Sequence, residues 1–322
     1  MRVSSNTREY STDLGLLALA AIWGINFSVV KIVLEEVGPL ALNALRFPLA
    51  VAALAWFLHK SPGPALPHRR DALRIIALGL VGNVAYQLCF IYGLDWTRAG
   101  NASLLLSTTP VWTLLLSALA GHERPTFWVS AGVLGTLAGM VLVVLGSGDA
   151  LSLGSDTLRG DLLMVVASIL WSIYTVAGRD PVSRYGALRV TTWSLYVGTP
   201  VLVMMGLPSL GWGTITSIGA ATWAGIAYAG VLSIGLAYLL WYRGVQKLGN
   251  NRTAVYSNLV PVAALATAWL WLGEVPTPLQ GAGAGVIMAG LTLARLAQSP
   301  GPSSANPSPT PSSSRWRISG KS

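Results

Sequence analysis

The sequence predicts an all-α integral membrane protein with ten transmembrane helices, built as two inverted five-helix repeats. Its mean hydropathy of +0.58, with 53% hydrophobic and only 10% charged residues, is typical of a bilayer protein rather than a soluble domain. Apolar stretches of about 20 residues, the length of a membrane-spanning helix, recur along the chain. Landmarks also repeat: Pro110 and Pro261, and likewise Glu123 and Glu274, lie 151 residues apart.

The apolar stretches follow one another with short connections, the longer ones being 59–73, 147–160 and 208–219. The first stretch continues through Trp23 into a full span, so it is predicted to be an uncleaved helix rather than a signal peptide. The ten predicted spans are 14–34, 39–58, 74–94, 98–119, 126–146, 161–180, 187–207, 220–242, 252–272 and 278–296.

Near the start of each repeat the distance between corresponding residues is 148 rather than 151. Asp13 corresponds to Asp161 at this distance, and Trp23 to Trp171. Five is an odd number of spans, so the two copies must have opposite orientations in one membrane. Inverted repeats of this kind are typical of secondary transporters, whose substrate site lies near the midplane between the repeats. The predicted organisation is a cytoplasmic N-terminus (1–13), a first repeat (14–147), a second repeat (161–297) and a disordered Pro/Ser-rich cytoplasmic tail (298–322).

The basic residues set the predicted orientation. With the N-terminus inside, most of the 21 Lys and Arg residues fall on the inner side, including Arg69, Arg70 and Arg74. Both termini are therefore predicted to be cytoplasmic, with the protein in the plasma membrane. The net charge of +9 is explained by an inner rim that faces anionic lipid headgroups, and no separate basic domain is present to bind nucleic acid.

Arg46 is the polar residue that lipid would penalise most, because it lies within the second span, in Leu45-Arg46-Phe47-Pro48. A central Arg costs about 2.5–3.5 kcal/mol to insert unless it faces protein or water. Two interpretations remain open. Arg46 either lines a cavity and attracts an anionic group, or it binds backbone carbonyls that Pro48 leaves without a donor.

Other polar and aromatic residues recur at helical spacing on repeat-related helices. Trp23 and Asn26 share one face of the first helix, and Trp171 and Tyr174 repeat that face in the sixth. The third, fourth, eighth and ninth helices carry similar faces, which predicts one central site. For the Ser and Thr residues the alternative is a contact between helices. The predicted substrate-binding residues are Trp23, Asn26, Arg46, Asn83, Gln87, Ser107, Trp171, Tyr174, Tyr238 and Asn258.

These observations predict a transporter of small organic solutes that works by alternating access. An enzyme is not predicted, nor a cofactor or a metal, because no His, Cys, Asp and Glu residues show catalytic or ligand spacing. A passive channel or facilitator remains the alternative, although a channel favours a continuous polar pore. A membrane enzyme is the more remote one.

Coupling is predicted to be gradient-driven facilitation or exchange, because Asp13 and Asp161 are expected to cap the first and sixth helices. Proton coupling through either residue, or through a substrate proton, stays open. Glycines on the fifth and tenth helices permit close backbone approach, so these helices are either packing elements or the face of a homodimer. Those glycines are Gly132, Gly135, Gly139, Gly281, Gly283, Gly285 and Gly290.

The chain resembles the drug/metabolite transporter superfamily, and within it the EamA-type transporters. The resemblance covers residues 12–297. It is carried by Trp23-Gly24-Ile25-Asn26-Phe27, Pro39-Leu40, Leu45-Arg46-Phe47, Gly121-His122-Glu123-Arg124-Pro125 and Leu272-Gly273-Glu274-Val275-Pro276. It implies a ten-helix bundle with cytoplasmic termini, and a central cavity lined mainly by the first, third, fourth, sixth, eighth and ninth helices. It also implies efflux of amino acids, other metabolites or drugs.

The second repeat departs from the first at two places: Ser172 replaces the glycine of the Trp-Gly pair, and Ser194 occupies the position of Arg46. The two halves are therefore chemically unequal, and the site is expected to be asymmetric.

Overall fold

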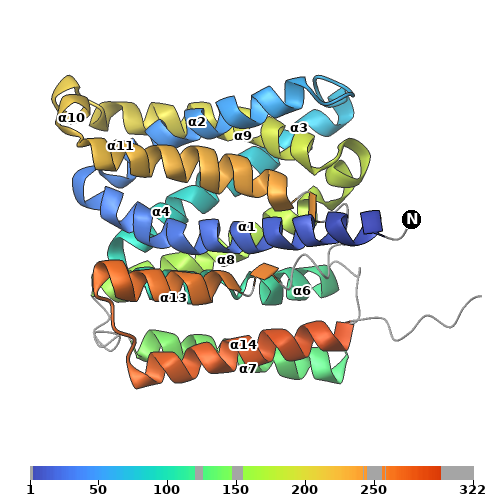
Figure 1. Cartoon of the computed structure of the whole chain (residues 1–322), viewed down its shortest axis with the longest axis vertical. Coiled ribbons are helices and arrows are strands. Elements are labelled where there is room, and N and C mark those ends of the chain that lie inside the picture. The colour runs from blue at the N-terminus through green and yellow to red at the C-terminus, as the bar shows by residue number, and fades with distance from the viewer. Residues whose placement is uncertain are drawn as a thin grey trace, which may run out of the picture.

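A computed structural model describes residues 3–119, 126–146, 155–241, 243–244, 256–257 and 259–298 (Figure 1). The predicted site residue Asn258 and most of the predicted tail lie outside the described residues. Within the described residues every regular element is helical, which confirms the all-α membrane fold.

The first repeat begins with two long helices, and two of its other spans contain an interruption. The third span contains a π-helical segment, η1, and the fourth span is divided near Ser107, shortly before Pro110. The elements are α1 (Val3–Glu36), α2 (Pro39–His59), α3 (Arg69–Gly79), η1 (Leu80–Ala85), α4 (Tyr86–Trp96), α5 (Ala99–Leu106), α6 (Thr109–Leu119) and α7 (Phe127–Leu145).

The second repeat follows the same plan, with a π-helical segment, η3, at the position that corresponds to η1. Helical backbone continues from η3 through 237–241. The elements are α8 (Asp156–Tyr185), α9 (Ala187–Gly206), η2 (Leu207–Ser209), α10 (Trp212–Ser217), α11 (Ala220–Ala227), η3 (Tyr228–Leu236), α13 (Leu259–Leu272) and α14 (Pro278–Gln298).

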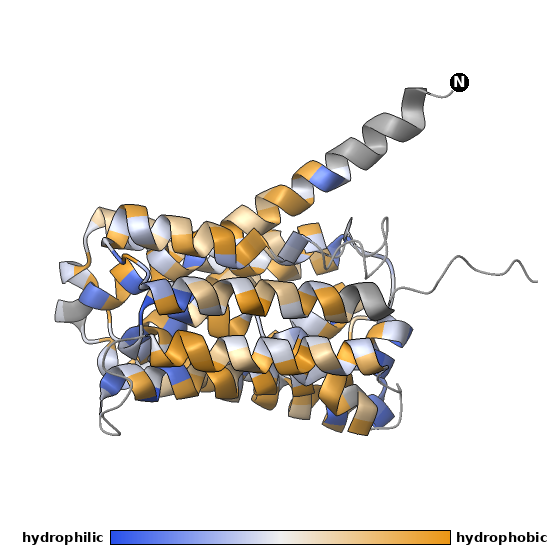
Figure 2. Ribbon diagram, turned by 90° about the horizontal axis from the view of Figure 1, so that it is seen from below, coloured by the Kyte–Doolittle hydropathy of each residue, from blue (hydrophilic) through white to orange (hydrophobic). Residues whose placement is uncertain are grey.

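In the described part of the chain seven helices are long and apolar enough to cross a membrane, and Leu259–Leu272 of α13 and Pro278–Ala294 of α14 are shorter apolar segments. Together with the divided α5–α6 span they make up the ten-helix arrangement. Helices that cross a bilayer must be hydrophobic along their length. Figure 2 shows this pattern: hydrophobic residues lie along the helices, and hydrophilic residues gather towards the two ends of the bundle.

Helices pack mainly across the repeats. α2 lies against α9, α7 lies against α14, α1 packs on α13 and η3, and α8 packs on α6 and α4 (Figure 1). The α1–α13 and α8–α6 contacts are the same contact seen from each repeat, as inverted repeats require.

The glycines of α7 and α14 bring these two helices together within one chain. A Cβ atom at Gly132 would lie 2.6 Å from the carbonyl oxygen of Gly290, and one at Gly139 would lie 2.7 Å from that of Gly283. These contacts make α7 and α14 packing elements, which was one of the two roles predicted for them.

The predicted helix caps are wrong. α8 begins at Asp156 and is capped by Ser155, whose hydroxyl accepts a hydrogen bond from the amide of Leu158, so Asp161 lies inside the helix. Its carboxylate is fully buried and accepts a hydrogen bond from the hydroxyl of Thr97. α1 begins well before Asp13, whose carboxylate accepts from Tyr256. The helices extend beyond their apolar stretches, and hydropathy alone does not show this.

Candidate functional site

Arg46 is the centre of the site. Its side chain is buried, with 2% of its surface exposed. Nε donates to Oδ1 of Asn43 at 3.1 Å, and Nη2 donates to Oε1 of Gln87 at 2.8 Å. The rings of Phe47 and Phe90 lie 5.6 and 5.7 Å from the guanidinium carbon, within the range of cation–π attraction.

The partners of Arg46 are neutral. Both hydrogen bonds go to side-chain amides rather than to backbone carbonyls near Pro48, and no carboxylate of the described residues forms an ion pair with it. A buried cation with only neutral partners carries an uncompensated desolvation cost. The site is therefore suited to receive an anionic group.

Two buried amide atoms, one on α2 beside Arg46 and one on α1, have no hydrogen-bond partner in the described structure. They are Nδ2 of Asn43, a donor, and Oδ1 of Asn26, an acceptor. Asn43 is fully buried and Asn26 nearly so. Because an unsatisfied buried polar atom costs about 1–3 kcal/mol, these atoms favour a ligand that supplies one acceptor and one donor.

Aromatic residues of both repeats form a cluster that reaches Arg46 through Tyr86, whose ring centroid lies 5.9 Å from that of Phe90. Trp23 and Trp171, which correspond to each other in the two repeats, both contact Tyr238, with ring centroids 6.2 and 6.4 Å apart respectively. Trp171 also contacts Tyr174 at 5.2 Å and Tyr86 at 4.9 Å. The structure thus brings four of the predicted aromatic residues together, and adds Tyr86, which the sequence analysis missed.

Asn83 has a different partner from Gln87, although both lie on the same span. Its Nδ2 donates to the hydroxyl of Ser194 at 3.0 Å. The hydroxyl of Tyr174 lies 3.2 Å from the hydroxyl oxygen of Ser194. Ser194 is the counterpart of Arg46 in the second repeat. At this corresponding position the first repeat has a cation and the second has a neutral hydroxyl, so the two repeats differ in charge, as expected.

Ser107 does not join this group through a side-chain bond, because its hydroxyl donates to the carbonyl of Leu104 in the same span at 2.7 Å. Ser and Thr hydroxyls often form such bonds within their own helix.

The π-helical segments η1 and η3 are a second feature that the sequence analysis missed. Asn83 lies in η1, and Ser233 in η3 accepts a hydrogen bond from Nε1 of Trp23 on its carbonyl oxygen at 3.0 Å. Single π-helical turns are frequent at functional sites. No residue type marks them in the sequence, since only the backbone hydrogen-bond pattern distinguishes them from an α-helix.

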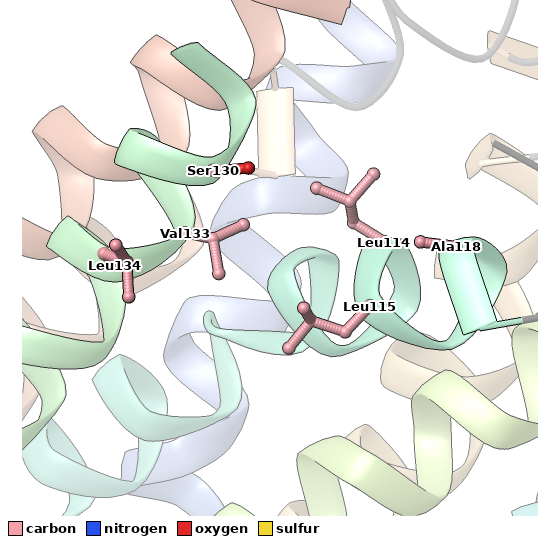
Figure 3. A pocket seen from close by; sticks show the side chains of 6 residues that line it. All are labelled: Leu114, Leu115, Ala118, Ser130, Val133 and Leu134. Atoms are coloured by element: carbon pink, nitrogen blue, oxygen red, sulfur yellow. The ribbon is translucent and has the colours of Figure 1, made fainter. Parts of the chain in front are cut away.

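A cavity of about 220 Å³ lies elsewhere, between α6 and α7 (Figure 3). Among the described residues its lining is aliphatic apart from one hydroxyl, so these residues offer no charged group to a solute. The lining residues are Leu114, Leu115, Ala118, Ser130, Val133 and Leu134.

Comparisons with known proteins agree with this architecture. The model of the EamA-like transporter family matches residues 11–145 and 158–296, one match in each half of the chain. A solved structure described as a crystal structure of protein shares the fold, with a TM-score of 0.62 and 21% identity over 89% of this chain and 97% of that one.

Three of the similar proteins are named as a transporter, an exporter and an efflux pump. An uncharacterized transporter of Archaeoglobus fulgidus is 33% identical, over 88% of this chain and 97% of its own. A probable terminal-alkyne amino-acid exporter of Streptantibioticus cattleyicolor is 30% identical, over 86% and 91% respectively. A probable amino-acid metabolite efflux pump of Salmonella typhimurium is 29% identical, over 86% and 93%. With a family match in both repeats and a ten-helix membrane bundle, the chain belongs to the EamA-like transporter family and is a membrane transporter of small solutes.

Proposed function

We propose that this transporter exports amino acids or closely related amino-acid metabolites from the cytoplasm, by alternating access at the site around Arg46. The observation that carries the proposal is the buried guanidinium of Arg46, which has only neutral partners among the described residues. A substrate carboxylate would neutralise this charge and form short charge-assisted hydrogen bonds.

The remaining polar atoms extend the match to an α-amino acid. Nδ2 of Asn43 can donate to the same carboxylate, and Oδ1 of Asn26 can accept from an ammonium group. The neighbouring aromatic residues Trp23, Trp171 and Tyr238 offer an apolar surface for a substrate side chain. Two relatives are named as an amino-acid exporter and an amino-acid metabolite efflux pump, which supports both the substrate class and the direction.

Orientation and assembly complete the proposal. The protein lies in the plasma membrane with both termini on the cytoplasmic side, because this orientation places most of the Lys and Arg residues inside. A homodimer through α7 and α14 would use faces other than the one on which their glycines meet. Gly281 and Gly285 lie on such a face, because a Cβ atom added at either residue would meet no atom within 4 Å.

Coupling is proposed to be facilitation or exchange. Substrate on the opposite side should accelerate uptake into proteoliposomes, whereas a channel shows no such counterflow. Since Asp161 is a buried carboxylate, proton coupling is the competing mechanism. An imposed pH gradient should drive accumulation in the intact protein, and not in Asp161→Asn, if that mechanism operates.

The experiment that tests the function is metabolite profiling of cells and medium, with the intact protein compared with Arg46→Ala at equal membrane levels. An amino acid or amino-acid metabolite should accumulate in the medium only with the intact protein. Accumulation inside the cells would contradict export and retain the carrier. Enrichment of solutes without a carboxylate would contradict the role of Arg46.

Asn26 provides a sharper prediction about the substrate. Asn26→Leu should weaken binding of the exported amino acid by about tenfold, since it removes one acceptor for an ammonium group. It should leave binding of the deaminated analogue unchanged. Binding isotherms for both compounds on purified protein measure this, and equal losses for the two would show that Asn26 does not contact the amino group.

A further inference from the structure

A network of polar side chains lies at one end of the bundle. We call this the distal end; it is the end at which α1 finishes at Glu36, away from the N-terminus (Figure 1). Its central feature is the turn between α4 and α5, which belongs to the first repeat. Side chains from both repeats hold this turn.

Glu274 binds the start of α5. It follows α13 in the second repeat, and its two carboxylate oxygens accept hydrogen bonds from the amides of Ala99 and Gly100 at 2.9 and 3.0 Å. These are the first helical residues of α5, whose amides have no partner within the helix. The positive end of the helix dipole strengthens the contact with a carboxylate.

Lys31 binds the other side of the same turn. Its ammonium group donates to the carbonyl oxygens of Leu94, Asp95 and Thr97 at 2.9, 2.6 and 2.7 Å. All three lie at the C-terminal end of α4, where a cation complements the helix dipole. At this turn the carboxylate of Glu274 binds the start of α5, and the ammonium group of Lys31 binds the end of α4. Each charge complements the dipole of the helix that it contacts.

Further bonds tie the turn to the second repeat. The hydroxyl of Thr97 donates to the buried carboxylate of Asp161 on α8, and Nε2 of Gln280 on α14 donates to Oδ1 of Asn101 at 2.7 Å. The α4–α5 turn is therefore held by α1, by α8, by α14 and by the segment after α13.

The counterpart of Lys31 in the second repeat is Arg179, which is exposed on α8. The segment that corresponds to the α4–α5 turn, residues 245–251, lies outside the described residues. In inverted repeats, corresponding contacts at the two ends are expected to alternate during transport. In this structure the contact of Lys31 with the α4–α5 turn is formed at the distal end.

We propose that Glu274 and Lys31 form a latch that closes the distal end, and that outward opening of the carrier requires both to release the α4–α5 turn. This rests on the proposed alternating access. Neither residue contacts the Arg46 site, so each acts by positioning the helices that cover it.

The test measures access to a buried position directly beneath the latch. Ser103 is 2% exposed and donates to the carbonyl of Gly100, the residue whose amide Glu274 binds. Ser103→Cys, in a Cys89→Ala background, would be labelled with a polar maleimide in purified protein in nanodiscs. With the latch intact, labelling should be slow.

Glu274→Gln keeps the shape of the side chain and removes the charge, so labelling at residue 103 should become about tenfold faster. Lys31→Met should have the same effect. Asp156→Asn removes an exposed carboxylate at the start of α8 and should change nothing. Unchanged labelling in Glu274→Gln would overturn the proposal.

A second reporter separates opening from unfolding. Ala50 in α2 is fully buried away from the latch, and Ala50→Cys should stay unlabelled in every variant. Equal acceleration at residues 50 and 103 would mean that Glu274 only holds the fold together, and would also overturn the latch. Because the assay needs neither substrate nor flux, its outcome is separate from that of metabolite profiling, which tests the transport function.

Discussion

Arg46→Met is expected to abolish export while leaving the unfolding temperature unchanged or higher. Arg46 makes two hydrogen bonds to neutral amides, and burying its charge without an anion costs folding free energy. Methionine keeps the aliphatic part of the side chain without the charge, and the loss of the two donors to Asn43 and Gln87 is offset by relief of the desolvation cost of the buried guanidinium. If the guanidinium binds a substrate carboxylate through two charge-assisted hydrogen bonds, at about 1.5–3 kcal/mol each, transport should fall by roughly a hundredfold or more.

The measurement combines flux in proteoliposomes with the unfolding temperature of the same purified variant. Arg159→Met is the matched control, because Arg159 is exposed near the start of α8 and should tolerate the same substitution in both assays. A lower unfolding temperature for Arg46→Met, with reduced membrane insertion, would show that Arg46 is structural.

Gly283→Val is expected to lower the stability of the bundle strongly, whereas Gly285→Val in the same helix is not. A Cβ atom at Gly283 would lie 2.8 Å from the carbonyl oxygen of Gly139 and 2.9 Å from the amide nitrogen of Val143, so α7 and α14 would have to separate. A Cβ atom at Gly285 meets open space. Overpacking of this kind costs about 1–3 kcal/mol.

Thermal unfolding of the two purified variants measures this difference. Both substitutions add the same side chain to α14, so helix propensity and hydrophobicity cancel in the comparison. Equal unfolding temperatures would mean that α7 and α14 do not depend on their close approach. If instead Gly285→Val alone changed the mass of the particle in solution, it would locate a dimer face.

The site could be predicted from the sequence only in part. Arg46 stands out because a charge within an apolar span is costly wherever it lies. The aromatic residues Trp23 and Trp171 stand out because the two repeats share them. Asn43 does not stand out, since an Asn near a helix end has no unusual local cost. Its relevance comes from its bond to Arg46 and from its second amide atom, which has no partner in the described structure.

The two predicted caps show why local reasoning fails here. Acidic residues near the start of apolar stretches are ordinary helix caps, so the sequence predicts that role for Asp13 and Asp161. In the structure the helices begin earlier, because polar residues extend a helix beyond the membrane-spanning part of its sequence. Asp161 becomes a buried acceptor for Thr97 instead.

By itself, the sequence determined the ten spans, their doubling and the class of protein. The physical reason is that the bilayer requires about 20 consecutive apolar residues with internally satisfied backbone, a condition that can be read over a short stretch of chain. Only the tertiary structure decided which polar groups meet. Arg46 and Gln87 are 41 residues apart, and Glu274 and Ala99 are 175 apart. Such pairs depend on how each helix is rotated and on where α4 ends and α5 begins, and neither is fixed by hydrophobicity along the chain.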